Sequence, residues 1–283
     1  MSFRSLITGV SLAAVLLLGG CNKLRLGYEY ADWLVIYSVE DNFELEKAQR
    51  IRFKDGVESY FNWHRKHMLP QYADLLSRAA DSLSKGLRPE GLDSGYNQFQ
   101  ALYRKTMEPT VGRAVDLLLA LTPAQVDQWQ EKQQKKNQKL KKDFSGSRED
   151  QLERRYEKTL DELEEWTGRL TPEQKKQVRI LSRGLPWNGH IWLEHREKVQ
   201  TRLAGLLKNK APREEIRKYL EDYLVYPERL RSQEYNARIK EAEAKTRTMV
   251  VRVHALLTAQ QRKHFITKVD KLARDFRTMS RQE

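Results

Sequence analysis

The sequence predicts an all-α protein, a multi-helix bundle of long antiparallel helices. Long stretches are rich in Leu, Glu, Lys, Arg, Gln and Ala, and no stretch alternates apolar and polar residues as a strand does. Apolar residues recur every three or four positions, as in Leu152, Tyr156, Leu160 and Leu163, which is the pattern of an amphipathic helix. With 39% hydrophobic residues and six Trp, the 283-residue chain can bury a core and is neither disordered nor a multi-span membrane protein.

The N-terminal segment has the layout of a secretory signal peptide. Residues 6–20 are apolar and follow one positive charge at Arg4, and this stretch is too short to span a bilayer comfortably. Small residues precede the single cysteine, in an order that resembles the bacterial lipobox: Leu17-Leu18-Gly19-Gly20-Cys21. The resemblance implies removal of residues 1–20 and lipidation of Cys21. An uncleaved anchor, or an ordinary signal peptide followed by a chance cysteine, is the alternative.

Lipidation of Cys21 would also indicate where in the cell envelope the protein is located. A mature chain whose single cysteine carries lipid has no thiol left to oxidise in the periplasm. Residue Asn22 is not the Asp that resembles an inner-membrane retention signal. We therefore expect an outer-membrane lipoprotein that faces the periplasm of a Gram-negative bacterium. Tyr28, Tyr30 and Trp33 follow Cys21 so closely that we expect their rings at the membrane interface.

Proline and glycine divide the rest of the chain into about eight to ten helices. The polar turn at 145–147 separates an N-terminal helical part, 21–144, from a C-terminal helical part, 145–283, and allows two lobes. Residues 128–143 have little apolar content after Trp129, so we expect this helix to project into solvent. The expected breaks are Gly86 to Gly95, Pro109, Pro123, the turn at 145–147, Pro172, Gly184 to Gly189, Pro212 and Pro227.

One short phrase opens several predicted helices. Its three close copies pair Thr122 with Gln125, Thr171 with Gln174 and Thr258 with Gln261, each after a leucine, and Leu45-Glu46-Lys47-Ala48-Gln49 is a looser copy. In a capping box the threonine accepts from the backbone N–H of the glutamine, and the glutamine side chain returns to the threonine N–H. Such a cap stabilises a helix by about 1 kcal/mol. The repeated Leu-Thr-x-x-Gln phrase also resembles the Spy and CpxP group of periplasmic stress proteins, in which such phrases flank a curved helical cradle that binds unfolded polypeptide.

A second resemblance covers most of the mature chain. Four phrases in order after Cys21 resemble an uncharacterised family of bacterial lipoproteins, domain of unknown function sixty-two seventy-nine. The resemblance implies an α-helical envelope lipoprotein and brings no activity with it. The phrases are Tyr28-Glu29-Tyr30-Ala31-Asp32-Trp33-Leu34, the stretch from Trp63 to Ala73, Glu165-Trp166-Thr167-Gly168-Arg169-Leu170-Thr171, and Glu194-His195-Arg196.

No catalytic or metal-binding constellation emerges from the sequence. His64 and His67 lie three residues apart with Glu58 nearby, but a transition-metal site needs three or four ligands, and no third His or Cys is close. The alternative to metal binding is a structural role, with one histidine at the boundary between core and solvent. The carboxylate pairs Asp161-Glu162 and Glu164-Glu165 lie at spacings that suit surface ion pairs. There is no Gly-x-Ser-x-Gly elbow and no phosphate-binding glycine loop, so we expect a non-enzymatic protein without a cofactor or metal.

The net charge of +13 has two interpretations, an anionic partner or an ordinary solvated surface, which is what a run of charges most often is. Nucleic acid is a poor candidate for an exported lipoprotein, which leaves lipid head groups, envelope polymers and acidic or unfolded proteins. We expect chaperone-like binding of polypeptide. The alternative is a structural or assembly lipoprotein that binds a dedicated envelope partner or an anionic polymer through its basic surface. The residues expected to make either contact are Lys132, Lys135, Lys136, Lys139, Lys141 and Lys142.

Overall fold

The computed structural model describes residues 27–186 and 188–282, so Cys21 and the expected signal peptide lie outside the described residues. The structure is 85% helical and contains eleven helices and no strand in the part that it describes, which confirms the predicted all-α class. None of these helices is long and apolar enough to cross a bilayer. The elements are α3 (Ala31–Phe43), α4 (Lys47–His67), α5 (Leu69–Ser84), α6 (Pro89–Leu119), α7 (Pro123–Asp143), α8 (Arg148–Thr167), α9 (Pro172–Arg183), α10 (Gly189–Lys208), α11 (Arg213–Leu224), the 3-10 turn η1 (Pro227–Arg229), α12 (Gln233–Leu256) and α13 (Ala259–Met279).

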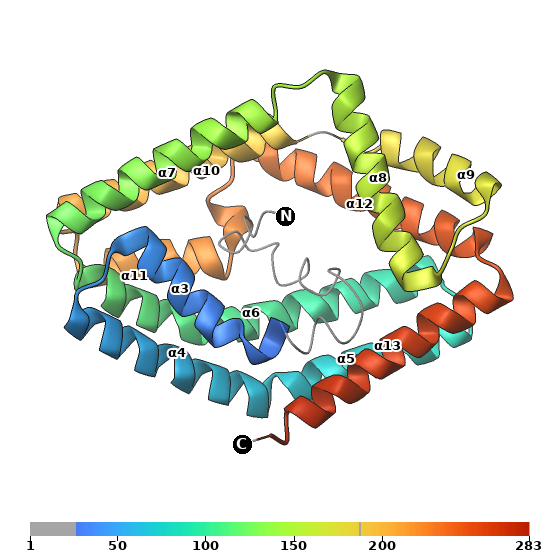
Figure 1. Cartoon of the computed structure of the whole chain (residues 1–283), viewed down its shortest axis with the longest axis horizontal. Coiled ribbons are helices and arrows are strands. Elements are labelled where there is room, and N and C mark those ends of the chain that lie inside the picture. The colour runs from blue at the N-terminus through green and yellow to red at the C-terminus, as the bar shows by residue number, and fades with distance from the viewer. Residues whose placement is uncertain (1–26, 187, 283) are drawn as a thin grey trace.

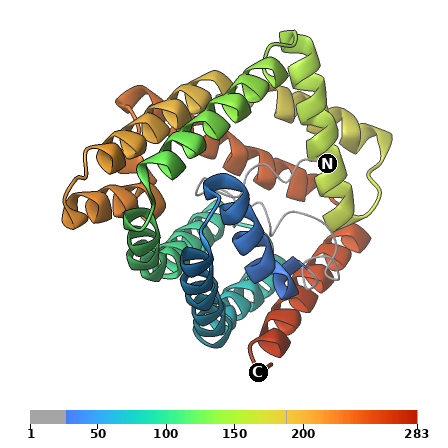
Figure 2. The same ribbon diagram turned by 60° about the vertical axis from the view of Figure 1, so that its left-hand side comes forward.

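The helices form a closed frame. Helices α7 and α10 lie side by side along one edge, and α5 and α13 lie side by side along the opposite edge (Figure 1). Helix α4 and the α9–α12 pair form the other two edges, and α6 contacts α4, α5 and α12. Figure 2 shows the same frame after rotation, with α3 lying in front of its middle.

The frame consists of two halves with the same helix order. In the first half α3 packs on α4 and α7, and α4 packs on α6. In the second half α8 packs on α9 and α13, and α9 packs on α12. The turn at 145–147 lies between the halves, and α11 with η1 is an insertion that has no counterpart in the first half.

The two halves exchange their last helices. Helix α7 ends the first half and packs along α10 of the second, while α13 ends the second half and packs along α5 of the first. Helices α6 and α12 hold equivalent places in the two halves, and they contact each other. Each half is therefore completed by a helix of the other.

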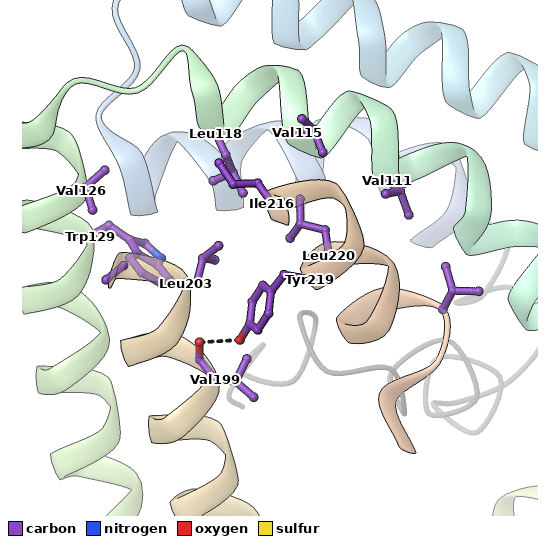
Figure 3. Close-up of a cluster of buried hydrophobic side chains, with 12 residues drawn as sticks. Val111, Val115, Leu118, Val126, Trp129, Val199, Leu203, Ile216, Tyr219 and Leu220 are labelled. Carbon is purple, nitrogen blue, oxygen red and sulfur yellow. Dashed lines mark hydrogen bonds between the residues drawn. The ribbon is translucent and has the colours of Figure 1, made fainter. Parts of the chain in front are cut away.

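Three separate apolar clusters lie within the walls of the frame, and the described residues form no single central core. The first cluster joins α6, α7, α10 and α11 around the fully buried Val115 and Ile216 (Figure 3). The second joins Met68, α5 and α13, and the third joins α8, α9 and α12. Since apolar burial is the main stabilising contribution, each wall is stabilised largely by its own cluster.

Two prolines act differently from the sequence prediction. Pro109 was expected to end a helix, yet it lies inside α6, where Arg113 donates to the Pro109 carbonyl at 2.8 Å. A break that was not predicted separates α4 from α5 at Met68, just before Pro70, whose missing N–H suits the first turn of a helix. This break contributes to a helix count above the expected eight to ten.

Candidate functional site

The first two glutamine phrases meet in a pair that we call the first clasp. Gln125 Nε2 donates to Gln49 Oε1 at 2.8 Å, and Gln49 Nε2 donates back to Gln125 Oε1 at 3.1 Å. Each amide also donates to the backbone of the other phrase: Gln125 to the Glu44 carbonyl and Gln49 to the Ala120 carbonyl. The clasp thus ties the start of α4 to the start of α7.

The second clasp repeats this geometry between α9 and α13. Gln174 Nε2 donates to Gln261 Oε1 at 2.8 Å, and Gln261 Nε2 donates to Gln174 Oε1 at 3.0 Å. The same two amides donate to the carbonyls of Leu256 and Arg169. Both glutamines are buried, so these hydrogen bonds form away from water, where leaving an amide unpaired is costly.

The capping boxes form at Thr122, Thr171 and Thr258. Each threonine N–H donates to the glutamine Oε1 at 2.9 Å, and each glutamine N–H donates back to the threonine hydroxyl. Each glutamine side chain therefore has two tasks, because it caps its own helix and binds the partner phrase. The second task joins residues that are 76 or 87 positions apart in the chain.

The composition of α7 predicted a helix that projects into solvent, and this prediction is wrong. The helix packs along α10 through an amide seam, which we define as Asn42, Gln133, Asn137 and Gln200 together with Arg196. The Gln133 amide donates to Asn42 Oδ1 at 2.8 Å, and Arg196 donates to Asn137 Oδ1 at 2.9 Å and Gln133 Oε1 at 3.0 Å. Gln133, Asn137 and Asn42 are buried, so the polar side chains of α7 replace an apolar stripe with hydrogen bonds.

The six lysines of α7 fall into two groups. Lys132 binds Glu44 at 2.6 Å and Lys136 binds Asp41 at 3.2 Å, which connects α7 to the C-terminal end of α3. The second group is exposed and has no carboxylate partner among the described residues. Its members are Lys135, Lys139, Lys141 and Lys142. Only the second group is free to attract an anionic partner.

Two of the three aromatic residues expected at the membrane interface are exposed, and the third is not. Tyr30 and Trp33 are 59% and 57% exposed. Tyr28 instead turns inward, where its hydroxyl lies 2.9 Å from His64 Nδ1 and its ring meets Phe61 edge to face. Burial raises the pKa of Tyr28 to about 12. Tyr37, which the sequence analysis did not place at the interface, is 59% exposed and stacks on Trp33 at 5.4 Å.

The two closely spaced histidines, His64 and His67, lie in different environments. His64 is buried among Tyr28, Tyr60 and Tyr72, and burial lowers its pKa to about 4. His67 is exposed beside Trp63. No group of three or more His, Cys, Asp or Glu side chains in residues 27–186 and 188–282 is placed to hold a metal ion. His64 is thus a neutral core histidine that belongs to the aromatic cluster.

A shallow groove of about 510 Å³ lies at the turn between α10 and α11. Its apolar part is formed mainly by Leu206, Ala211 and Pro212, and its charged part by Arg202, Lys210 and Glu215; Gly205 and Asn209 complete the lining. The Arg202 guanidinium lies 5.4 Å from the Tyr219 ring centroid, and the Tyr219 hydroxyl donates to the Val199 carbonyl at 2.7 Å (Figure 3). The groove therefore mixes basic and apolar side chains on a wall braced by the first cluster. No sequence motif predicts this groove, although Lys210-Ala211-Pro212 marks the turn.

Comparison with known proteins gives one match. A protein-family model, described as a family of unknown function (DUF6279), matches residues 41–236, which is more than half of the chain. No curated protein and no solved structure matches the chain. The match includes the first clasp, α7 with the amide seam, and the α10–α11 groove, but not α3 before Asp41 or helix α13.

Proposed function

The chain belongs to the DUF6279 family, and because that family has no known function, we propose one from the geometry: a lipid-anchored envelope protein that binds polypeptide in a chaperone-like manner without catalysis. The observation that carries the proposal is the groove between α10 and α11. Its mixture of basic and apolar side chains is what an unfolded segment requires, because such a segment presents apolar and charged groups together.

The size and charge of the groove define the class of ligand. About 510 Å³ accommodates a few side chains of an extended segment and not a folded domain. Arg202 and Lys210 outnumber Glu215, so the groove favours segments that carry acidic residues next to apolar ones. Leu206, Ala211 and Pro212 supply the apolar contact.

The two clasps support the same proposal. Their Leu-Thr-x-x-Gln phrases are the ones that resemble the Spy and CpxP group, where they flank a polypeptide-binding cradle. In this chain the phrases join in pairs and hold two corners of the helical frame. A braced frame keeps its binding surface ordered while an unfolded segment binds and leaves.

Aggregation of a denaturing test protein measures this activity. The full-length protein in lipid nanodiscs is expected to suppress light scattering at an equal molar ratio, and high salt is expected to weaken the effect. Arg202→Ser with Lys210→Ser should abolish suppression. The matched control is Lys176→Ser with Lys263→Ser, which removes equal charge from exposed positions on α9 and α13 and should leave suppression intact.

Two results would redirect the proposal. Absence of suppression at low and high salt would favour the alternative, a dedicated envelope partner or anionic polymer, to be sought by crosslinking in intact cells. The anchor is tested separately with Cys21→Ser, which should move the protein out of the membrane fraction. Unchanged partitioning of that variant would reject lipidation.

A further inference from the structure

An exposed aromatic stripe consists of Tyr30, the N-cap residue directly before helix α3, and Trp33 and Tyr37 within α3. Their side chains are 57–59% exposed, and the rings of Trp33 and Tyr37 stack at an interplanar angle of 14°. The other exposed large apolar residues are spread over α4, α6, α9 and α12, where scattered apolar side chains are ordinary. Three exposed aromatic side chains between residues 30 and 37 are unusual, because such rings gain free energy by leaving water.

The stripe lies close to the expected lipid attachment point in the chain. Tyr30 follows Cys21 by nine positions. Even fully extended, this segment spans at most about 30 Å. A membrane that holds acyl chains on Cys21 is therefore always within this distance of the start of α3. Tyrosine and tryptophan are the side chains that favour the boundary between head groups and acyl chains.

Helix α7 packs on α3 and adds positive charge beside it. Lys132 and Lys136 bind Glu44 and Asp41 at the acidic end of α3, which neutralises those carboxylates. Lys135 lies three residues after Lys132, and Lys139 lies three residues after Lys136, so the four lysines share one side of α7. Lys135 and Lys139 are exposed and have no carboxylate partner in the described part of the chain. Figure 1 shows α3 and α7 together on the face toward the viewer.

We propose that the aromatic stripe of α3 and the lysines Lys135 and Lys139 of α7 form one docking surface for the phospholipid head groups of the membrane that holds Cys21. The proposal depends on the lipid anchor and is independent of polypeptide binding. The rings enter the head-group boundary, and the two lysines bind lipid phosphates. Docking holds α7 and α3 against the bilayer and fixes which side of the frame faces away from it.

Quenching of tryptophan fluorescence by brominated acyl chains tests the docking. The full lipidated protein is reconstituted into vesicles of phosphatidylethanolamine and phosphatidylglycerol that contain a brominated lipid. We expect part of the fluorescence to be quenched, and Trp33→Phe to lose that quenched part. Trp192→Phe, which removes a partly buried tryptophan on α10, should retain it. Equal quenching in wild type and Trp33→Phe would overturn the proposal.

Charge provides a second measurement that does not alter the aromatic rings. Removal of Lys135 or Lys139 is expected to lower the ratio of docked to undocked protein about fivefold for each lysine. Lys176→Ser with Lys263→Ser is the control, with equal loss of charge and no expected effect. If the control lowers quenching as much as Lys135→Ser with Lys139→Ser, general attraction accounts for binding and the docking surface is wrong. Vesicle flotation without incorporated protein would reject both anchor and docking, whereas quenching without suppression of aggregation would reject only polypeptide binding.

Discussion

Replacing Gln174 with methionine tests whether the clasp stabilises the fold. Methionine preserves the length of the side chain and removes its amide. The amide makes four hydrogen bonds, to the Thr171 N–H, the Leu256 carbonyl and both polar atoms of Gln261. At about 1 kcal/mol net for each bond, the expected loss of unfolding free energy is about 3–4 kcal/mol.

Denaturant unfolding of a double-mutant cycle isolates the bonds between the two glutamines. Gln174→Met, Gln261→Met and the double variant are compared with wild type. Since two hydrogen bonds join the pair, the coupling free energy is expected to be about 1–2 kcal/mol. Gln177→Met is the matched control on α9, because its amide bonds to Glu173 at the surface, and it should cost less than about 0.5 kcal/mol.

Simple addition of the two single effects would contradict a stabilising bond between the glutamines. Additivity within about 0.3 kcal/mol would mean that the reciprocal bonds contribute nothing beyond the two capping boxes. The equivalent cycle on Gln49 and Gln125 serves as a repeat within the same molecule, and it should give a coupling of the same sign.

Three further predictions concern stability and use denaturant unfolding. Burial lowers the pKa of His64 to about 4 from 6.5, so the unfolded chain binds more protons between these values. Stability should therefore fall as pH drops from about 6.5 to 4, by about 3 kcal/mol in all, and His64→Gln should reduce this slope. Ile216→Ala empties a fully buried site in the first cluster and should cost about 3 kcal/mol, and a loss below about 1 kcal/mol would contradict that packing. Gly168→Ala should cost about 1–3 kcal/mol, because φ is +81° there, while Gly112→Ala at an exposed position of α6 should stabilise by about 0.5–1 kcal/mol. Equal effects of the two substitutions would show that backbone conformation is not the cause.

Local signals in the sequence were sufficient to predict the helices and their caps. A capping box depends on residues three positions apart, so Thr171 and Gln174 predict it directly. The clasp depends on Gln261, which lies 87 residues from Gln174, and no local pattern connects them. The sequence therefore predicted one task of each glutamine and not the other.

The direction in which a side chain points was harder to predict than the helix that carries it. Closeness to Cys21 suggested that Tyr28 faces the membrane, but the hydroxyl of Tyr28 binds His64, which lies 36 residues further on. Tyr37 could have been found, because it follows Trp33 by one helical turn. Gln133 and Asn137 suggested a solvated helix, since side chains that satisfy each other across helices carry no apolar signal.

The exchange of helices between the two halves determines when the protein can complete its fold. Helix α5 is synthesised early, yet its partner along one whole edge is α13, and Arg277 reaches back to Ser77 across 200 residues. Contacts this distant in sequence form late, because the intervening chain must be ordered first. Until α13 has been made, the apolar side of α5 that carries Tyr72 and Ala73 lacks its cover. A growing chain of this protein therefore carries an open apolar surface for most of its synthesis, and a truncated chain would keep it permanently.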